Sequence, residues 1–151
     1  MNFIDKFDFY FILVLICSIC ILLFIISGLS ISYQEAVLYF SDDNVTSKLA
    51  KLSTNIFGVN DYTFRIPNMT LFALNLTLIY LISNKVLKHK KDSILCVIIY
   101  ALLPGVIMQG VLLNQSSVIL FVVLLVCYIE ITYNKIAYPI LVICVFLGPS
   151  I

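Results

Sequence analysis

The segment Phe9-Tyr-Phe-Ile-Leu-Val-Leu-Ile-Cys-Ser-Ile-Cys-Ile-Leu-Leu-Phe-Ile-Ile-Ser-Gly-Leu29 holds no charged residue. A helix that crosses the hydrocarbon core of a bilayer, about 30 Å thick, needs about 20 mostly apolar residues. The segment therefore predicts a membrane-spanning helix. Its apolar run is longer than that of a secretory signal peptide, and the leader before it holds one lysine against two aspartates. We therefore interpret it as an uncleaved anchor.

The composition of the whole chain points the same way. Apolar residues make up 62% of the 151 residues and charged residues 11%, whereas soluble globular proteins have about 45–50% and about 25%. A soluble domain of this length has too little interior to hide so much apolar surface. The net charge of +1, without a basic stripe, excludes a protein that binds nucleic acid through bulk electrostatics. A disordered chain and a secreted disulfide scaffold are excluded as well.

Four further apolar segments follow the first. They span residues 67–82, 94–113 (interrupted by Pro104-Gly105), 117–132, and the stretch from 136 onward. Lipid offers backbone groups no outside hydrogen-bond partner, so these segments are expected to be helical. The sequence therefore predicts an all-α fold, a polytopic membrane helix bundle with about five transmembrane helices, and a kink at Pro104-Gly105.

The basic residues predict the orientation of the bundle. Residues 85–91, between the second and third segments, hold four lysines, and Lys6 and Lys135 fall on the same side under strict alternation. The opposite side holds Lys48, Lys51 and Arg65. The positive-inside rule then places the amino terminus in the cytoplasm and residues 30–65 outside, in a multi-pass protein of the inner (plasma) membrane. Binding of anionic lipid head groups by the lysine cluster is the alternative interpretation.

The predicted outer loop, residues 30–65, is the long stretch of mixed polarity. Its apolar residues Val45, Leu49, Leu52 and Ile56 recur at spacings of four, three and four, and Lys48 and Lys51 lie beside them. This pattern predicts a basic amphipathic helix that lies on the membrane surface, starts at Asp43 or Asn44 and ends at Gly58. The loop also holds four carboxylates, which make it the place where a divalent cation could bind: Glu35, Asp42, Asp43 and Asp61.

The cysteines give no sign of a metal or redox site. All five lie in apolar runs, and the Cys17-x-x-Cys20 pair would need a thiolate inside hydrocarbon, which is strongly disfavoured. We interpret them as small apolar residues. The chain also has no nucleotide-phosphate loop, no His-Glu-x-x-His motif and no nucleophile elbow.

Three stretches carry a family resemblance. They are Ser32-Tyr-Gln-Glu-Ala-Val-Leu-Tyr-Phe40, Ile56-Phe-Gly-Val-Asn-Asp-Tyr-Thr-Phe-Arg-Ile-Pro67 and Ala101-Leu-Leu-Pro-Gly105. In this order they resemble the amino-terminal part of GT-C-fold membrane glycosyltransferases, in particular the family that includes protein O-mannosyltransferases and lipid A aminoarabinose transferases. The resemblance covers nearly the whole chain.

The resemblance implies transfer of a sugar from a polyprenyl-phosphate carrier to an acceptor on the outer face of the membrane. A carboxylate of the first outer loop would act as base, which makes Glu35 the candidate, against the alternative of an ordinary interfacial carboxylate. The candidate substrate-binding residues are Arg65, Tyr33 and Tyr39. The Arg65 guanidinium could hold a lipid phosphate or the loop carboxylates. Alternatively, Arg65 marks the end of a span that Pro67 opens.

Two departures from the family pattern weaken the enzymatic interpretation. Gln34 stands where the family has an aspartate, and Leu113-Asn-Gln-Ser-Ser-Val118 lacks the carboxylate that many members carry at the start of the fourth helix. Family members also continue through further helices. We therefore expect residues 1–151 to form a single transmembrane module, the amino-terminal portion of a longer protein, inactive as this fragment.

The alternative function is that of a non-enzymatic membrane protein. The chain could be a scaffold subunit with a membrane protein partner, or a transporter fragment, which should carry polar residues at mid-membrane. Asn75, Thr77 and Gln109 are the residues that hint at the transporter. Membrane lipid is the expected surrounding in either case.

Overall fold

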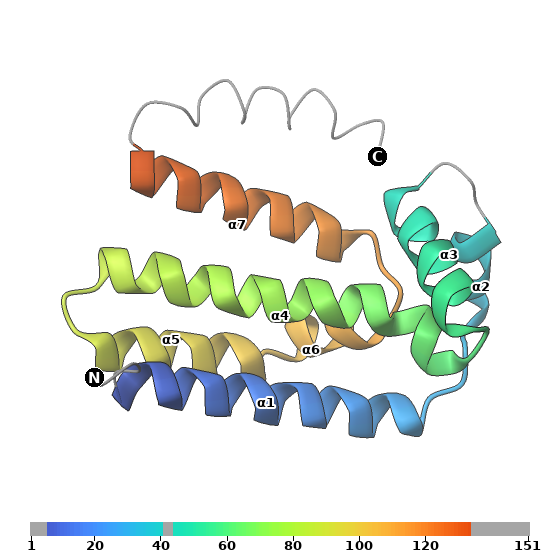
Figure 1. The fold of residues 1–151 in the computed structure, drawn as a ribbon, viewed down its shortest axis with the longest axis horizontal. Coiled ribbons are helices and arrows are strands. Elements are labelled where there is room, and N and C mark those ends of the chain that lie inside the picture. Colours follow the sequence, from blue (N-terminus) through green and yellow to red (C-terminus); the bar gives the residue numbers. More distant parts are fainter. Residues whose placement is uncertain (1–5, 41–43, 134–151) are drawn as a thin grey trace.

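The computed structural model describes residues 6–40 and 44–133, and within them every regular element is a helix. The helices are α1 (Lys6–Ser27), α2 (Tyr33–Phe40), α3 (Val45–Phe57), α4 (Asp61–Val86), α5 (Lys90–Leu102), α6 (Pro104–Val111) and α7 (Ser116–Tyr133). The long helices lie side by side, and α2 and α3 cover one end of the bundle (Figure 1). The predicted all-α membrane bundle is confirmed.

Two helices of the described part, α1 and α4, are long and apolar enough to cross a membrane. The pair α5 and α6 passes the same test as one broken span, and α7 is apolar but shorter over its described length. Four of the predicted apolar segments are thus helical. The fifth, from residue 136, lies outside the described residues, as do Lys135, Asp42 and Asp43. The count of about five spans stays a prediction.

Helix α4 is the central element of the bundle, and it contacts α1, α3, α5, α6 and α7. The main core joins α1, α4, α5 and α6 through Leu22, Ile26, Phe72, Leu76, Tyr80, Val97, Ala101, Val106 and Val111. Lipid tails are as apolar as these side chains, so the helices gain little from hydrophobicity alone. Close complementary packing must therefore hold the core together.

The third predicted span is broken, as the Pro104-Gly105 pair indicated. Leu103 adopts an extended conformation (φ −65°, ψ 123°), and Pro104 begins α6, where its missing N–H costs no helical bond. The axes of α5 and α6 differ by 66°. The predicted kink is confirmed.

The prediction that Pro67 opens the second span was wrong. Helix α4 begins at Asp61 and runs through Pro67. A proline inside a helix leaves the carbonyl four residues earlier without its helical donor. Here that carbonyl belongs to Thr63, and the Ser53 hydroxyl of α3 donates to it at 2.7 Å. The contact with α3 therefore lets the helix continue.

Helix α3 has the bounds that the sequence predicted, starting after Asn44 and ending at Gly58, whose φ is +86°. Its small and polar face is buried in the protein: Thr46, Ser47, Ala50, Ser53 and Thr54. Its apolar stripe points away from the protein: Val45, Leu49, Leu52 and Ile56 are all exposed. The small residues allow α3 to approach α4 closely. The exposed apolar stripe is free to contact a second apolar surrounding outside the protein. That this surrounding is the membrane surface stays a prediction.

Gly110 allows α6 to approach α1 and α4. A Cβ on Gly110 would lie 2.9 Å from Leu22 Cδ1 and 3.1 Å from Phe72 Cδ2, whereas a Cβ on Gly105 would meet no atom within 4 Å. We predict that Gly110→Ala destabilises the bundle by about 1–3 kcal/mol through overpacking. Gly105→Ala, the matched control, should leave stability unchanged or slightly raised. Thermal unfolding in detergent measures both. Equal unfolding midpoints for the two variants would contradict the prediction.

Candidate functional site

A capping box starts α2 and places Glu35 in its first turn. The Ser32 N–H donates to Glu35 Oε2 (2.9 Å), and Ser32 Oγ accepts from the Glu35 N–H (3.3 Å). The Ser-x-x-Glu spacing satisfies two backbone donors that a helix start leaves without helical partners. The Glu35 carboxylate is consequently turned back toward the start of its own helix, and the residue is only 2% exposed.

Arg65, in the second turn of α4, binds this carboxylate with two hydrogen bonds. Its Nε donates to Glu35 Oε1 (3.1 Å) and its Nη2 to Oε2 (2.9 Å). Nη1 donates to the Leu29 carbonyl (2.9 Å), and Nη2 also donates to the Ser30 carbonyl (3.0 Å). Arg65 is fully buried. A buried ion pair is stable only where further hydrogen bonds compensate its desolvation, and this pair has them on both sides.

The turn between α6 and α7 completes the site. The Leu113 N–H donates to Glu35 Oε1 (3.0 Å). Asn68, one turn after Arg65 on α4, donates from Nδ2 to the Leu112 carbonyl (2.6 Å). Helix α4 thus holds the connection between α1 and α2 through Arg65 and the turn between α6 and α7 through Asn68. The sequence reasoning missed the roles of Asn68 and Leu113.

The partners of Glu35 decide its protonation. Burial raises the pKa of this carboxyl, but the hydrogen bonds from Arg65, those from the N–H groups of Ser32 and Leu113, and the charge of Arg65 outweigh burial. The pKa of Glu35 is therefore held below its ordinary value of 4.5. In this arrangement the group is an ionised acceptor that already receives four hydrogen bonds. It can take a proton at neutral pH only after some of these donors withdraw.

The other candidate residues lie apart from the ion pair. Tyr33 is 84% exposed, and Gln34 beside it is exposed as well. The Tyr39 hydroxyl shares a hydrogen bond with Thr54 Oγ1 (3.0 Å), and its ring lies 5.0 Å from that of Phe64. Tyr39 thus belongs to the contact of α2 with α3 and α4, while Tyr33 and Gln34 face outward from the start of α2.

Metal ligands are not gathered in the described part of the chain. Residues 6–40 and 44–133 contain no group of three His, Cys, Asp or Glu side chains that could hold an ion. Glu35 is neutralised by Arg65, Asp61 is exposed, and Asp42 and Asp43 lie outside the described residues. The divalent cation predicted for the outer loop stays a prediction. The cysteines described, Cys17, Cys20, Cys96 and Cys127, are free thiols.

Comparison with known proteins identifies a family. Residues 45–148 match the family model described as dolichyl-phosphate-mannose-protein mannosyltransferase. The matched range, more than half of the chain, includes Arg65, Asn68 and the turn between α6 and α7, whereas α2 with Tyr33, Glu35 and Tyr39 precedes it. No curated protein and no solved structure matches the chain.

The lowered pKa of Glu35 predicts how stability depends on pH. A carboxyl whose folded pKa is depressed stabilises the fold above its unfolded pKa, here the ordinary value of 4.5, and this contribution is lost as pH falls through the folded pKa. The unfolding midpoint of the wild type should therefore fall more steeply between about pH 5 and pH 3 than that of Glu35→Gln. Thermal unfolding across this range tests it, with exposed Glu130→Gln as control. Parallel pH curves for wild type and Glu35→Gln would contradict it.

Removal of one partner of the buried ion pair should be costly. Arg65→Met leaves the Glu35 carboxylate buried without its charge partner, which costs about 3–5 kcal/mol of folding free energy. The double variant Arg65→Met with Glu35→Leu removes both charges and should regain part of this loss. Chemical denaturation in mixed micelles measures the two values. A single variant as stable as the wild type would show that the pair does not hold the site.

Proposed function

The chain belongs to the dolichyl-phosphate-mannose-protein mannosyltransferase family, a family of membrane glycosyltransferases, and from this we propose that it contributes the first outer-face site of a sugar transferase. The donor is a sugar on a polyprenyl-phosphate carrier, and the acceptor carries a hydroxyl group. The observation that supports this site most directly is the fully buried Arg65–Glu35 pair at the end of the bundle covered by α2 and α3.

The proposed side of the membrane rests on charge. The lysine-rich residues 85–91, where α4 ends and α5 begins, lie at the opposite end of α4 from α2 and α3 (Figure 1). Basic loops stay on the cytoplasmic side. The Arg65–Glu35 pair then belongs to the outer face, where a carrier lipid that has been flipped across the membrane would present its sugar.

The proposed chemistry requires the protein to orient two substrates and to remove one proton. The acceptor oxygen attacks the anomeric carbon, the bond from that carbon to the phosphate oxygen breaks, and the phosphate leaves with the electron pair. The acceptor proton passes to a base. Since the lipid phosphate is already a good leaving group, orientation of the two partners and removal of one proton account for most of the catalysis.

Glu35 and Arg65 fit this chemistry under one condition. The Glu35 carboxylate acts as base only in a state in which Arg65 has turned toward the carrier phosphate, since in the resting state the guanidinium occupies both carboxylate oxygens. A phosphate is a suitable second partner for a guanidinium, because both can form two parallel hydrogen bonds. Before Arg65 turns toward the phosphate, the Arg65–Glu35 pair holds the outer loop in position. Exposed Tyr33 is proposed to contact substrate directly, and Tyr39 to support α2 against α3.

A transfer assay tests the function and the role of Glu35. Membranes that contain the full-length protein are incubated with radiolabelled polyprenyl-phosphate mannose, and labelled acceptor is counted. Loss of a general base should reduce transfer by about 10²–10⁴-fold in Glu35→Gln, whereas Tyr33→Phe should lose far less. Unfolding midpoints are measured beside the rates, so that a fold defect is recognised. Undiminished transfer by well-folded Glu35→Gln would remove Glu35 from the base role.

A scaffold function is the second candidate, because two carboxylates of the family pattern are missing: Gln34 stands where the family has an aspartate, and residues 113–118 hold no carboxylate. Gln34 is exposed and cannot accept a proton at neutral pH. Absence of transfer with several polyprenyl-phosphate sugars, together with stable co-purification with a membrane protein, would favour the scaffold.

A further inference from the structure

Asn68 is linked to Glu35 through a single peptide unit. Its Nδ2 donates to the Leu112 carbonyl at 2.6 Å, and the Leu113 N–H donates to Glu35 Oε1 at 3.0 Å. This carbonyl and this N–H belong to one peptide bond, which is planar and has the two groups on opposite edges. The two hydrogen bonds therefore hold the two edges of one rigid unit, and a rotation that breaks one of them also disturbs the other.

The amide of Asn68 serves the turn between α6 and α7 through its nitrogen. Nδ2 also lies 3.4 Å from the Gln109 carbonyl, the Asn114 carbonyl and Ser117 Oγ. Asn68 is fully buried, and its Oδ1 has no hydrogen-bond partner among the described residues. An apolar side chain of the same size would avoid the cost of that unpaired oxygen. The N–H donors are therefore what this amide contributes.

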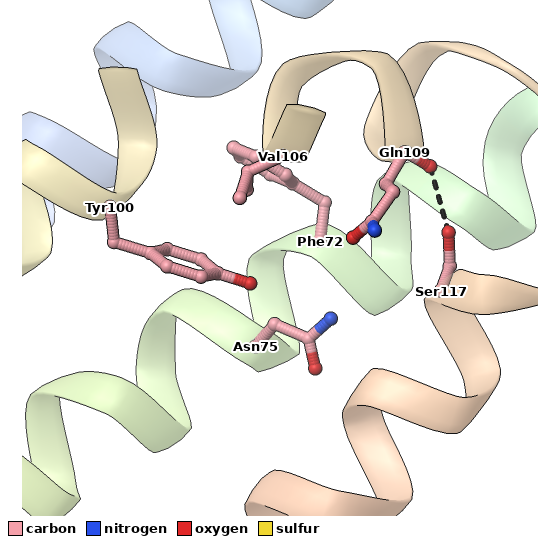
Figure 2. A pocket seen from close by; sticks show the side chains of 6 residues that line it. All are labelled: Phe72, Asn75, Tyr100, Val106, Gln109 and Ser117. Carbon is pink, nitrogen blue, oxygen red and sulfur yellow. Dashed lines mark hydrogen bonds between the residues drawn. The ribbon is translucent and has the colours of Figure 1, made fainter. Parts of the chain in front are cut away.

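Other contacts hold the turn in place but do not orient this peptide. The Leu113 side chain packs into the small cluster between α3 and α4. The Ser117 hydroxyl donates to the Gln109 carbonyl at 2.9 Å and joins α6 to α7 (Figure 2). Neither contact involves the carbonyl or the N–H of the Leu112–Leu113 peptide. Asn68 is thus the side chain that fixes the direction in which this N–H points.

We propose that Asn68 is a positioning residue for Glu35, acting through the Leu112–Leu113 peptide. This rests on the proposed function, in which Arg65 turns from Glu35 toward the carrier phosphate. Arg65 supplies two of the four hydrogen bonds to the carboxylate, one on each oxygen. After it turns away, Oε1 keeps the N–H of this peptide and Oε2 keeps the Ser32 N–H. Asn68 then keeps the carboxylate aimed at the acceptor hydroxyl.

Infrared spectroscopy of the full-length protein in nanodiscs tests the proposal through the pH at which Glu35 takes a proton. The band of the protonated carboxyl is assigned by its absence in Glu35→Gln. The Leu113 N–H favours the ionised form of Glu35, so loss of the Asn68 donor should weaken this bond and raise the pKa of Glu35. We therefore expect Asn68→Leu to protonate Glu35 at a higher pH than the wild type does.

The charges around Glu35 are the same in this variant. Among the described residues, Arg65 of α4 is the charged group that acts on the carboxyl, and it stays in place. The α1–α2 connection and the α6–α7 turn contact the carboxylate through backbone N–H groups. A change in the protonation pH therefore reports on the hydrogen bonds rather than on a new charge.

Asn75→Leu is the matched control. Asn75 is a second buried amide of α4, about two turns after Asn68, and it lies beside Tyr100 and Gln109 (Figure 2). This variant should protonate Glu35 at the wild-type pH. If Asn68→Leu does not fold, Asn68→Ala removes the same donor without adding a methyl group, and Asn75→Ala becomes its control.

A second measurement asks whether Asn68 acts through this peptide. Incorporation of the α-hydroxy analogue of leucine at position 113 replaces the peptide by an ester, which has no N–H. It should also raise the pH at which Glu35 takes a proton. Its effect and that of Asn68→Leu should not add, because both interrupt the same connection. Fully additive effects would overturn the proposal.

Transfer rates separate this proposal from the proposed function. Misplacement of a reacting group should lower kcat in Asn68→Leu by about 10²-fold and leave KM for the carrier nearly unchanged. An unchanged protonation pH of Glu35 in Asn68→Leu overturns the proposal, as does an equal rise in Asn75→Leu. If the wild type transfers no sugar but the infrared shift is specific to Asn68, the proposed function fails while the positioning of Glu35 by Asn68 stands.

Discussion

The buried ion pair between Arg65 and Glu35 is the contact on which the outer end of the bundle depends. One guanidinium joins the carbonyls of the α1–α2 connection to the first turn of α2, and the same carboxylate accepts an N–H from the turn between α6 and α7. Three segments far apart in the chain therefore meet at two side chains. Neither charge can be buried alone, since the desolvation of each is compensated by the other and by the surrounding backbone.

Helix α4 connects the buried ion pair to the rest of the bundle. Its buried face presents Arg65, Asn68 and Asn75 in succession. Arg65 and Asn68 bind different distant segments, and the proline at position 67 is tolerated because Ser53 satisfies the freed carbonyl. A membrane helix with so many polar residues gains specificity from hydrogen bonds rather than from apolar burial, because lipid competes equally for apolar surface. The outer site is built on this face.

Family membership and geometry bear on the function in different ways. The family match establishes a membrane glycosyltransferase lineage, and it starts at residue 45, after Glu35. The geometry shows Glu35 as an engaged, ionised group whose first task is structural. A catalytic role for Glu35 therefore implies a rearrangement around Arg65, and this links substrate binding to the order of the outer loop. A scaffold would instead retain the same pair for its fold alone.

The sequence by itself determined the class of the protein, because uncharged segments of about 20 residues are stable only inside a membrane. It also determined the break at Pro104 and the bounds of α3, since both follow from local rules for proline, helix caps and glycine. The Ser32–Glu35 spacing was readable as a capping box as well. The tertiary structure alone decided that α4 starts six residues before Pro67, that Arg65 holds Glu35 rather than water, and that Leu113 and Asn68 join them. These depend on partners between 10 and 78 residues away in the chain, and no local pattern specifies which distant group will satisfy a buried charge or a freed carbonyl.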